Sequence, residues 1–237
     1  MKARDDAALG GFWAKALGWE LSSEGPGVTN LEPPGFDYPD PAAVCIDLVV
    51  SPEPKVGRNR VHVDLATRSE AHQAELVARL EGLGATRADV GQGDDVSWVV
   101  LADPEGNEFC VLDWHDPDRD TGPIASVVVH CADPEALARF YVEATDWALQ
   151  KTTDDSAVLR SAAGVGPYLV FLRTTDPKTG WNRVHLDLRP YPGDDLESEA
   201  ARLLELGATA VDLDGADIRW KVLADPEGNE FCLLTPG

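Results

Sequence analysis

Two short segments combine side chains that can take part in chemistry. The segments Asn59–Leu65 (NRVHVDL) and Asn182–Leu188 (NRVHLDL) place an arginine, a histidine and an aspartate at alternate positions. Alternate residues of a β-strand point to the same face of a sheet, so each trio forms a polar stripe opposite an aliphatic one. The stripes are Arg60, His62 and Asp64, and Arg183, His185 and Asp187. The aliphatic face must pack under helices, so each polar stripe is left to line a cleft or to face solvent.

A second pair of segments offers further side chains of this kind. Leu101–Leu112 (LADPEGNEFCVL) and Leu223–Leu234 (LADPEGNEFCLL) agree at eleven of twelve positions. The shared DPEGN is typical of a turn, with an aspartate that caps it, a proline that presets φ and a glycine that supplies a positive φ. The turn does not require a glutamate at the position that follows it, so Glu108 and Glu230 need another explanation. Each is predicted to share a strand face with the cysteine two residues on, Cys110 or Cys232.

These matches show that the chain is a tandem repeat. The histidines of the two stripes are 123 residues apart (185 minus 62), and the aspartates of the two turns are 122 apart (225 minus 103). An upstream match pairs Phe12 with Phe140, 128 residues apart (140 minus 12). Landmarks in one order at nearly constant spacing indicate two copies of one module. We predict a first module over 1–114, a linker over 115–123 and a second module over 124–237.

Each module is predicted to contain two βαβββ units. In the second module, an opening strand is followed by a helix that starts at a proline, then by three short apolar segments, and the order then repeats. The predicted elements are the strand Ser126–Cys131, a helix from Pro134 to about Asp146, the segments Trp147–Thr152, Ala157–Ser161 and Tyr168–Arg173, the strand Asn182–Leu188, a helix over roughly Leu196–Leu206 and a last strand Asn229–Leu234. The first module lacks nearly all of the opening strand, because Met1 aligns with Val129. Either that strand is absent or the start lies upstream of the one used here.

Composition excludes several classes of protein. The formal charge of −22 disfavours nucleic acid and anionic membranes, which require clustered lysines and arginines. No apolar run is long enough to span a bilayer, and no secretory signal precedes the first module, so we predict a cytoplasmic protein. The four cysteines have no zinc-ribbon spacing and are expected to be free thiols: Cys45, Cys110, Cys131 and Cys232.

The paired βαβββ units, the HxDL strand and the closing DPEGNEF strand together resemble the vicinal oxygen chelate superfamily, closest to its glyoxalase-like branch. The resemblance covers nearly the whole chain. It implies an α+β fold in which curled mixed sheets surround a cleft. That fold serves metal-dependent enzymes, such as glyoxalase I and extradiol dioxygenases, and metal-free binding proteins, such as bleomycin-resistance proteins, so it does not settle the function.

The resemblance also implies where a metal would bind. Metal-dependent members carry ligands on the first, fifth and eighth strands of a module. His62 and His185 match the fifth-strand histidine, but Cys110 and Cys232 occupy the eighth-strand position, with the glutamates two residues earlier. Ser126 occupies the first-strand position, and His130 lies four residues on. The set that resembles a metal site most is therefore His130, His185 and Glu230, which would suit zinc, nickel, manganese or iron.

The same residues have simpler interpretations. Arg60 with Asp64, and Arg183 with Asp187, could form ion pairs on a solvated strand. His62 and His185 could simply hydrogen-bond to the aspartate of their own stripe. Trp98 and Trp220 precede the two turns at matching positions and would offer stacking surfaces at the mouth of a cleft. The predicted cleft residues are Arg60, His62, Asp64, Trp98, Glu108, His130, Arg183, His185, Asp187, Trp220 and Glu230.

The sequence supports two hypotheses of function. The first is a glyoxalase- or bleomycin-resistance-like protein that binds a small organic molecule, in resistance or sequestration, with no cofactor assigned. The alternative is a divalent-metal-dependent lyase or dioxygenase, in which the second module would act because it has its opening strand. The modules are expected to pair within the chain or through a homodimer. Scaffolding without a ligand is a third class, and thermal stability would then not respond to small molecules.

Overall fold

A computed structural model describes residues 1–93, 95–115, 120–213 and 218–237 and has an α+β architecture. The elements of the first half are β1 (Lys2–Ala3), α1 (Asp6–Leu17), β2 (Glu20–Gly25), β3 (Val28–Glu32), β4 (Ile46–Val50), β5 (Val61–Leu65), α2 (Glu70–Gly82), β6 (Thr86–Arg87), β7 (Val99–Ala102) and β8 (Glu108–Val111). Those of the second half are β9 (Ile124–Cys131), α3 (Pro134–Ala144), β10 (Trp147–Thr152), β11 (Ser156–Ser161), β12 (Tyr168–Arg173), β13 (Leu186–Leu188), α4 (Leu196–Glu205), β14 (Thr209–Ala210), β15 (Lys221–Ala224) and β16 (Glu230–Leu233). The predicted order βαβββ, two units in each module, is confirmed.

The two modules share their largest sheet. An eight-stranded sheet has the order β10-β11-β12-β9-β5-β8-β7-β6, so it joins the first unit of the second module to the second unit of the first module. The junction is the antiparallel pair β5–β9, in which His62 lies opposite Val128 and Asp64 opposite Ser126. The remaining units form two four-stranded sheets, β1-β4-β3-β2 and β13-β16-β15-β14. The eight-stranded sheet is therefore built from both modules.

The second half of the repeat has a shorter central strand than predicted. We expected a strand over Asn182–Leu188, but β13 covers only Leu186–Leu188. Its counterpart β5 is paired on both sides, with β9 and with β8, whereas β13 is paired only with β16. On its other side β1 has two residues, and one bond from the Lys2 amide to the Arg183 carbonyl (2.8 Å) takes the place of a ladder. A strand needs hydrogen-bonding partners, so the short opening strand shortens its neighbour.

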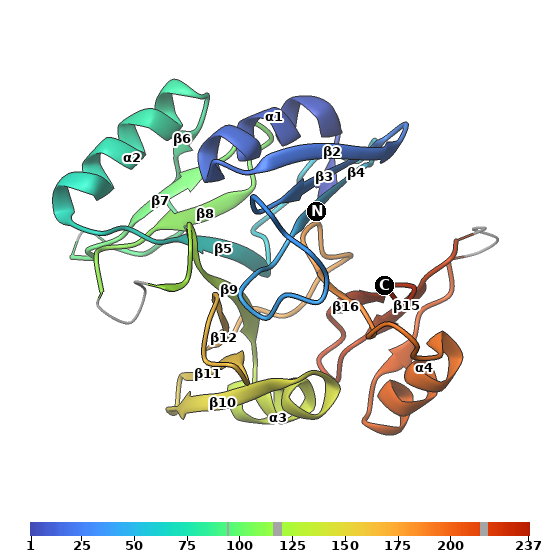
Figure 1. Cartoon of the computed structure of the whole chain (residues 1–237). Helices are drawn as coiled ribbons and strands as arrows, with labels where there is room; N and C mark the ends of the chain where they lie inside the picture. Colours follow the sequence, from blue (N-terminus) through green and yellow to red (C-terminus); the bar gives the residue numbers. More distant parts are fainter. Residues whose placement is uncertain (94, 116–119, 214–217) are drawn as a thin grey trace.

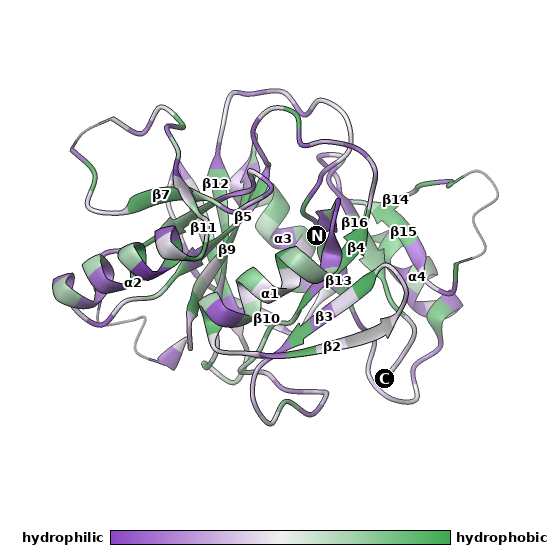
Figure 2. Ribbon diagram, turned by 90° about the horizontal axis from the view of Figure 1, so that it is seen from above, coloured by the Kyte–Doolittle hydropathy of each residue, from purple (hydrophilic) through white to green (hydrophobic). Residues whose placement is uncertain are grey.

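Two hydrophobic cores lie between helices and sheets. The first surrounds Trp13 and Phe109, and the second surrounds Tyr141 and Phe231; all four side chains are almost fully buried. Figure 1 shows α1 and α2 on one side of the molecule and α3 and α4 on the opposite side. In Figure 2, hydrophobic colouring follows much of β5 and β9, while α2 and α4 carry both colours, as expected for helices with one packed and one solvated face.

The sequence dictates this packing by strand alternation. In β5, Val61, Val63 and Leu65 are buried in the cores, which leaves His62 on the other face. The DPEGN turns have the predicted chemistry: Asp103 accepts hydrogen bonds from the Glu105 and Asn107 amides, and Gly106 has a φ of +87°. Among the described residues, no helix is both long and apolar enough to cross a membrane.

Candidate functional site

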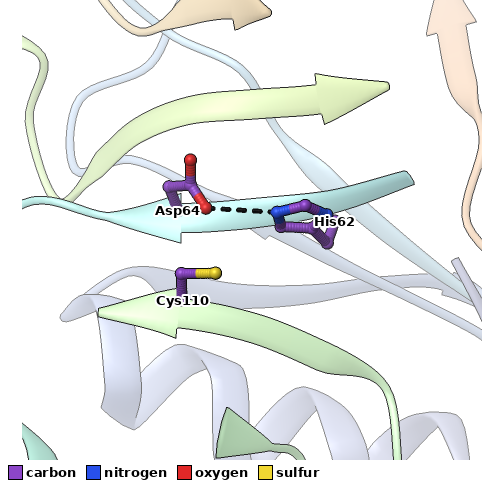
Figure 3. Close-up of side chains that lie close together, drawn as sticks. All are labelled: His62, Asp64 and Cys110. Carbon is purple, nitrogen blue, oxygen red and sulfur yellow. Dashed lines mark ion pairs between the residues drawn. The ribbon is translucent and has the colours of Figure 1, made fainter. Parts of the chain in front are cut away.

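A histidine, an aspartate and a cysteine lie close together on one face of the eight-stranded sheet (Figure 3). His62 and Asp64 come from β5 and Cys110 from the neighbouring β8, where it is paired with Asp64. One potential ligand atom from each lies within 4.8 Å of the others. The His62 Nε2 is 3.3 Å from Asp64 Oδ1, the distance of an ion pair, so the histidine does lie beside its own aspartate, but the contact lacks the geometry of the predicted hydrogen bond.

The second module completes this group through β9. Ser126 donates a hydrogen bond from Oγ to Asp64 Oδ2 (2.7 Å), and the His130 ring lies 5.3 Å from the His62 ring between centroids. Two buried atoms here have no hydrogen-bond partner among the described residues, Asp64 Oδ1 and His130 Nε2. Asp64 Oδ1 has the His62 Nε2 at 3.3 Å, whereas no described group meets His130 Nε2. Buried polar atoms are nearly always satisfied, so His130 Nε2 points to a group that binds beside it. We call His62, Asp64, Cys110, Ser126 and His130 the first site.

The electrostatics of the first site favour neutral donors and acceptors. Burial lowers the pKa of His130 to about 4, and the positive charge of His62 and of two nearby arginines acts in the same direction. Burial also raises the pKa of Cys110, with the Asp64 carboxylate adding to the effect. At neutral pH, His130 is thus an uncharged imidazole and Cys110 an uncharged thiol.

The wall around the first site is apolar. The strand register places Val128 opposite His62, Val170 opposite Val128 and Val158 opposite Val170, so the three valines share the face of the site. Val128 is 4% exposed, while Val158 and Val170 are half-buried. A few polar groups in an apolar wall are the usual composition of a small-molecule site.

The repeat produces a second cluster, which has a different wall. His185, Asp187 and Cys232 also bring ligand atoms within 4.8 Å of one another, with 3.3 Å between His185 Nε2 and Asp187 Oδ1. Burial raises the pKa of Cys232 to about 12. Burial opposes ionisation of Asp187 too, but the hydrogen bond from His185 and its charge outweigh it and lower the pKa of that carboxyl.

Around this second cluster, polar residues replace two of the three valines. By register, Asn30 stands where Val158 stands in the first site, and Asp47 stands where Val170 does. The two are hydrogen-bonded to each other, from Asn30 Nδ2 to Asp47 Oδ1 at 2.7 Å. The two sites therefore share their cluster but differ in the surface that a ligand would meet.

Both clusters fit a zinc-like cation by donor type. Imidazole nitrogen, carboxylate oxygen and thiolate sulfur are all zinc ligands, and three protein ligands leave a position open. In the first site, the unsatisfied Asp64 Oδ1 is one such ligand atom. Cys110 would have to lose its proton to bind, against its raised pKa, which makes occupancy dependent on pH.

The predicted triad of His130, His185 and Glu230 is not assembled. His130 lies on β9 beside His62, while His185 lies next to β13 in another sheet. Glu230 and its counterpart Glu108 are engaged elsewhere. Lys178 pairs with Glu230 at 2.8 Å and Lys55 with Glu108 at 2.6 Å. Sequence positions within one module could not reveal that each site takes strands from both modules.

The predicted ion pairs within the stripes are also wrong. Arg183 pairs with Glu105 at 2.5 Å, and Arg60 lies 3.6 Å from Glu227, so each arginine reaches the DPEGN turn of the other module. Glu105 also accepts the Arg4 and Asp5 amides, and Glu227 accepts the Ala132 and Asp133 amides. These glutamates thus connect the modules.

The turn glutamates and the two lysines are not among the predicted site residues, although the sequence contains a signal for their role. The repeat extends upstream of the stripes as PKxGxNR, from Pro54 to Arg60 and from Pro177 to Arg183. The lysine in each copy pairs with a glutamate of the closing strand, and the glutamate of each turn meets an arginine. Trp98 and Trp220 are about equally exposed, 40% and 39%, and their place at a cleft mouth stays a prediction.

Comparison with known proteins agrees with the fold. The chain is similar to glyoxalase I from Zea mays, with 17% identity and a TM-score of 0.65 over 99% of this chain and 89% of that one. It is also similar to a putative dioxygenase from Bacillus subtilis, with 13% identity and a TM-score of 0.63 over 99% of this chain and 82% of that one. At these identities the likeness concerns the fold alone. No curated protein matches the sequence. The family model described as Glyoxalase-like domain matches residues 1–112 and again 126–234, so the chain belongs to that family, in two tandem copies.

Proposed function

We propose that the protein binds a small organic molecule in the first site. The observation that carries this proposal is the buried His130 Nε2, which has no hydrogen-bond partner among the described residues and lies on the same sheet face as Val128. A ligand hydroxyl could hydrogen-bond to the neutral imidazole of His130, while an apolar body packs on Val128 and its neighbours. The family supplies the fold for such a site, and the residues of this chain give it its polarity.

A thermal-shift screen of small hydroxylated aromatic and aliphatic compounds would test the proposal. We expect hits whose stabilisation is lost in His130→Gln and kept in His185→Gln, because only the first variant changes the first site. Stabilisation by a ligand follows its free concentration relative to Kd, so the loss can be quantified. If no compound distinguishes the two variants, the first site is not where ligands bind.

A second candidate function is metal-dependent chemistry of the lyase or dioxygenase type. One observation favours it: among the described residues, a cluster of imidazole, carboxylate and thiol occurs in each of the two modules. A bound divalent cation would act as a Lewis acid that polarises an oxygen atom of the substrate. In the first site His62, Asp64 and Cys110 would hold it, and His130 would lie beside the substrate.

Elemental analysis after dialysis against zinc, nickel, manganese and iron salts tests this second candidate. We expect about two equivalents of metal in the wild type, one for each cluster. His62→Ala and His185→Ala should each lose one of them. His72→Ala, which changes a helix residue outside both clusters, is the control. Metal content that is the same in all variants would contradict metal binding at the clusters.

A further inference from the structure

Arg60 and Arg183 are equivalent residues with unequal surroundings. Arg183 uses its whole guanidinium group: Nε donates to Asn107 Oδ1 at 3.1 Å, Nη1 to the Glu53 carbonyl at 2.9 Å and Nη2 to Glu105 at 2.5 Å. Arg60 donates from Nη1 to the Asp176 carbonyl at 2.9 Å, and its Nη2 lies 3.6 Å from Glu227. Its Nε is buried and has no partner among the described residues.

The unsatisfied side chain borders an open groove. A cavity of about 620 Å³ lies between Arg60 of the first module and residues from both units of the second module. The lining residues are Arg60, Ala132, Arg173, Thr174, Thr175, Asp176, Pro177, Lys178 and Glu227. Three of them are cationic and two are acidic, whereas the chain as a whole carries a formal charge of −22. Lys178 is already neutralised by Glu230 at 2.8 Å, whereas the carboxylate contacts of Arg60 and Arg173 are longer, at 3.6 and 3.9 Å.

The geometry points to a site for a small carboxylate in this groove, and we propose that Arg60 binds it. At Arg183, the chain itself supplies the acceptor for Nε, the Asn107 side chain. At Arg60, a ligand oxygen would supply it, because an unpaired buried donor on a charged group is costly to leave unsatisfied. A guanidinium group presents parallel N–H donors that match the two oxygens of a carboxylate.

The acidic residues of the groove restrict the ligand further. Glu227 and Asp176 line the same cavity, so a phosphate dianion would meet more repulsion than a monoanion. Donor groups on the ligand, such as the hydroxyl of a hydroxy acid or the ammonium of an amino acid, could instead bond to Glu227. The ligand class is therefore a small hydroxy- or amino-carboxylate. No residue of the first site lines this groove, so its occupancy does not rest on the proposed function.

Acetate is the simplest probe of this site. In protein labelled with ¹⁵N-arginine, the Nε–H resonance of Arg60 is assigned as the signal that disappears in Arg60→Lys. We expect acetate, added at constant ionic strength, to shift this resonance saturably, while the Nε–H resonance of Arg183 stays in place. Acetamide, the neutral analogue, should have no effect.

Two exposed threonines provide a matched pair of variants. Thr175 lines the groove, whereas Thr179, in the same loop, does not. Thr175→Glu should weaken acetate binding by about tenfold through charge repulsion, and Thr179→Glu should leave it unchanged. Both side chains are exposed, so the fold should tolerate either change.

Three results would overturn the proposal. One is the absence of a saturable shift of the Arg60 resonance with acetate. Another is equal acetate affinity in Thr175→Glu and Thr179→Glu. The last is tighter binding of inorganic phosphate than of acetate, which would contradict the assignment of a carboxylate.

Discussion

At the scale of single residues, the chemistry of the first site depends on a histidine that burial keeps neutral. The pKa of His130 is lowered to about 4, from about 6.5 when unfolded. As pH falls between these values, the unfolded state binds a proton that the folded state does not. The folded protein therefore loses stability over this window, by roughly 3 kcal/mol in total from this group.

Replacing this histidine tests the pKa. In His130→Gln no proton can bind at this position, so the free energy of unfolding should depend less on pH between about 6.5 and 4 than in the wild type. Urea unfolding at a series of pH values measures this difference. His115→Gln, a change at an exposed histidine, should follow the wild-type curve. Parallel curves for His130→Gln and the wild type would show that His130 titrates normally.

At the scale of elements, the two arginines that join the modules should differ in their contribution to stability. The side chains of Arg183 and Glu105 are 8% and 9% exposed, so Arg183→Gln leaves a buried carboxylate without its partner and should cost about 3 kcal/mol. Arg60→Gln breaks a longer contact and should cost about 1 kcal/mol. Denaturant unfolding of both variants measures the difference. Equal losses would mean that the tighter geometry at Arg183 adds no stability.

Strand alternation explains which elements could be predicted from the sequence. Period-2 patterns identify the buried faces of β5 and β16, and a proline after an N-capping aspartate correctly places the start of α3. The extent of β13 could not be predicted, because it depends on a partner strand rather than on its own residues. The roles of Glu105 and Glu227 could not be predicted either, because their arginine partners lie in the other module.

At the scale of the whole molecule, the sequence revealed two modules but not how they combine. Within the first module, β4 and β5 lie in different sheets, and the longest shared ladder, β5–β9, crosses between modules. A repeat gives no information on whether a unit pairs with its own module or with the other one. That missing step is why a triad of His130, His185 and Glu230 seemed reasonable from the sequence and does not form.

Exchange of units between modules predicts that neither half folds alone as a monomer. Residues 1–112 and 126–234, expressed separately, each contain two units that lack their sheet partner. We expect each half to be unfolded or self-associated, and the mixture to recover a one-to-one complex. Light scattering with size exclusion, together with circular dichroism, measures this. A folded monomeric half would contradict the shared sheet.

The first site spans the two modules and brings His62 and His130 together. Histidine-selective NMR of the wild-type protein tests whether these two rings are in contact. The experiment needs no ligand, and its spectrum is simple because the chain has five histidines. With 5.3 Å between ring centroids, we predict a nuclear Overhauser effect between the ring protons of His62 and His130, and a titration of His130 near pH 4. The absence of that effect, or one between His130 and His185 instead, would contradict the account.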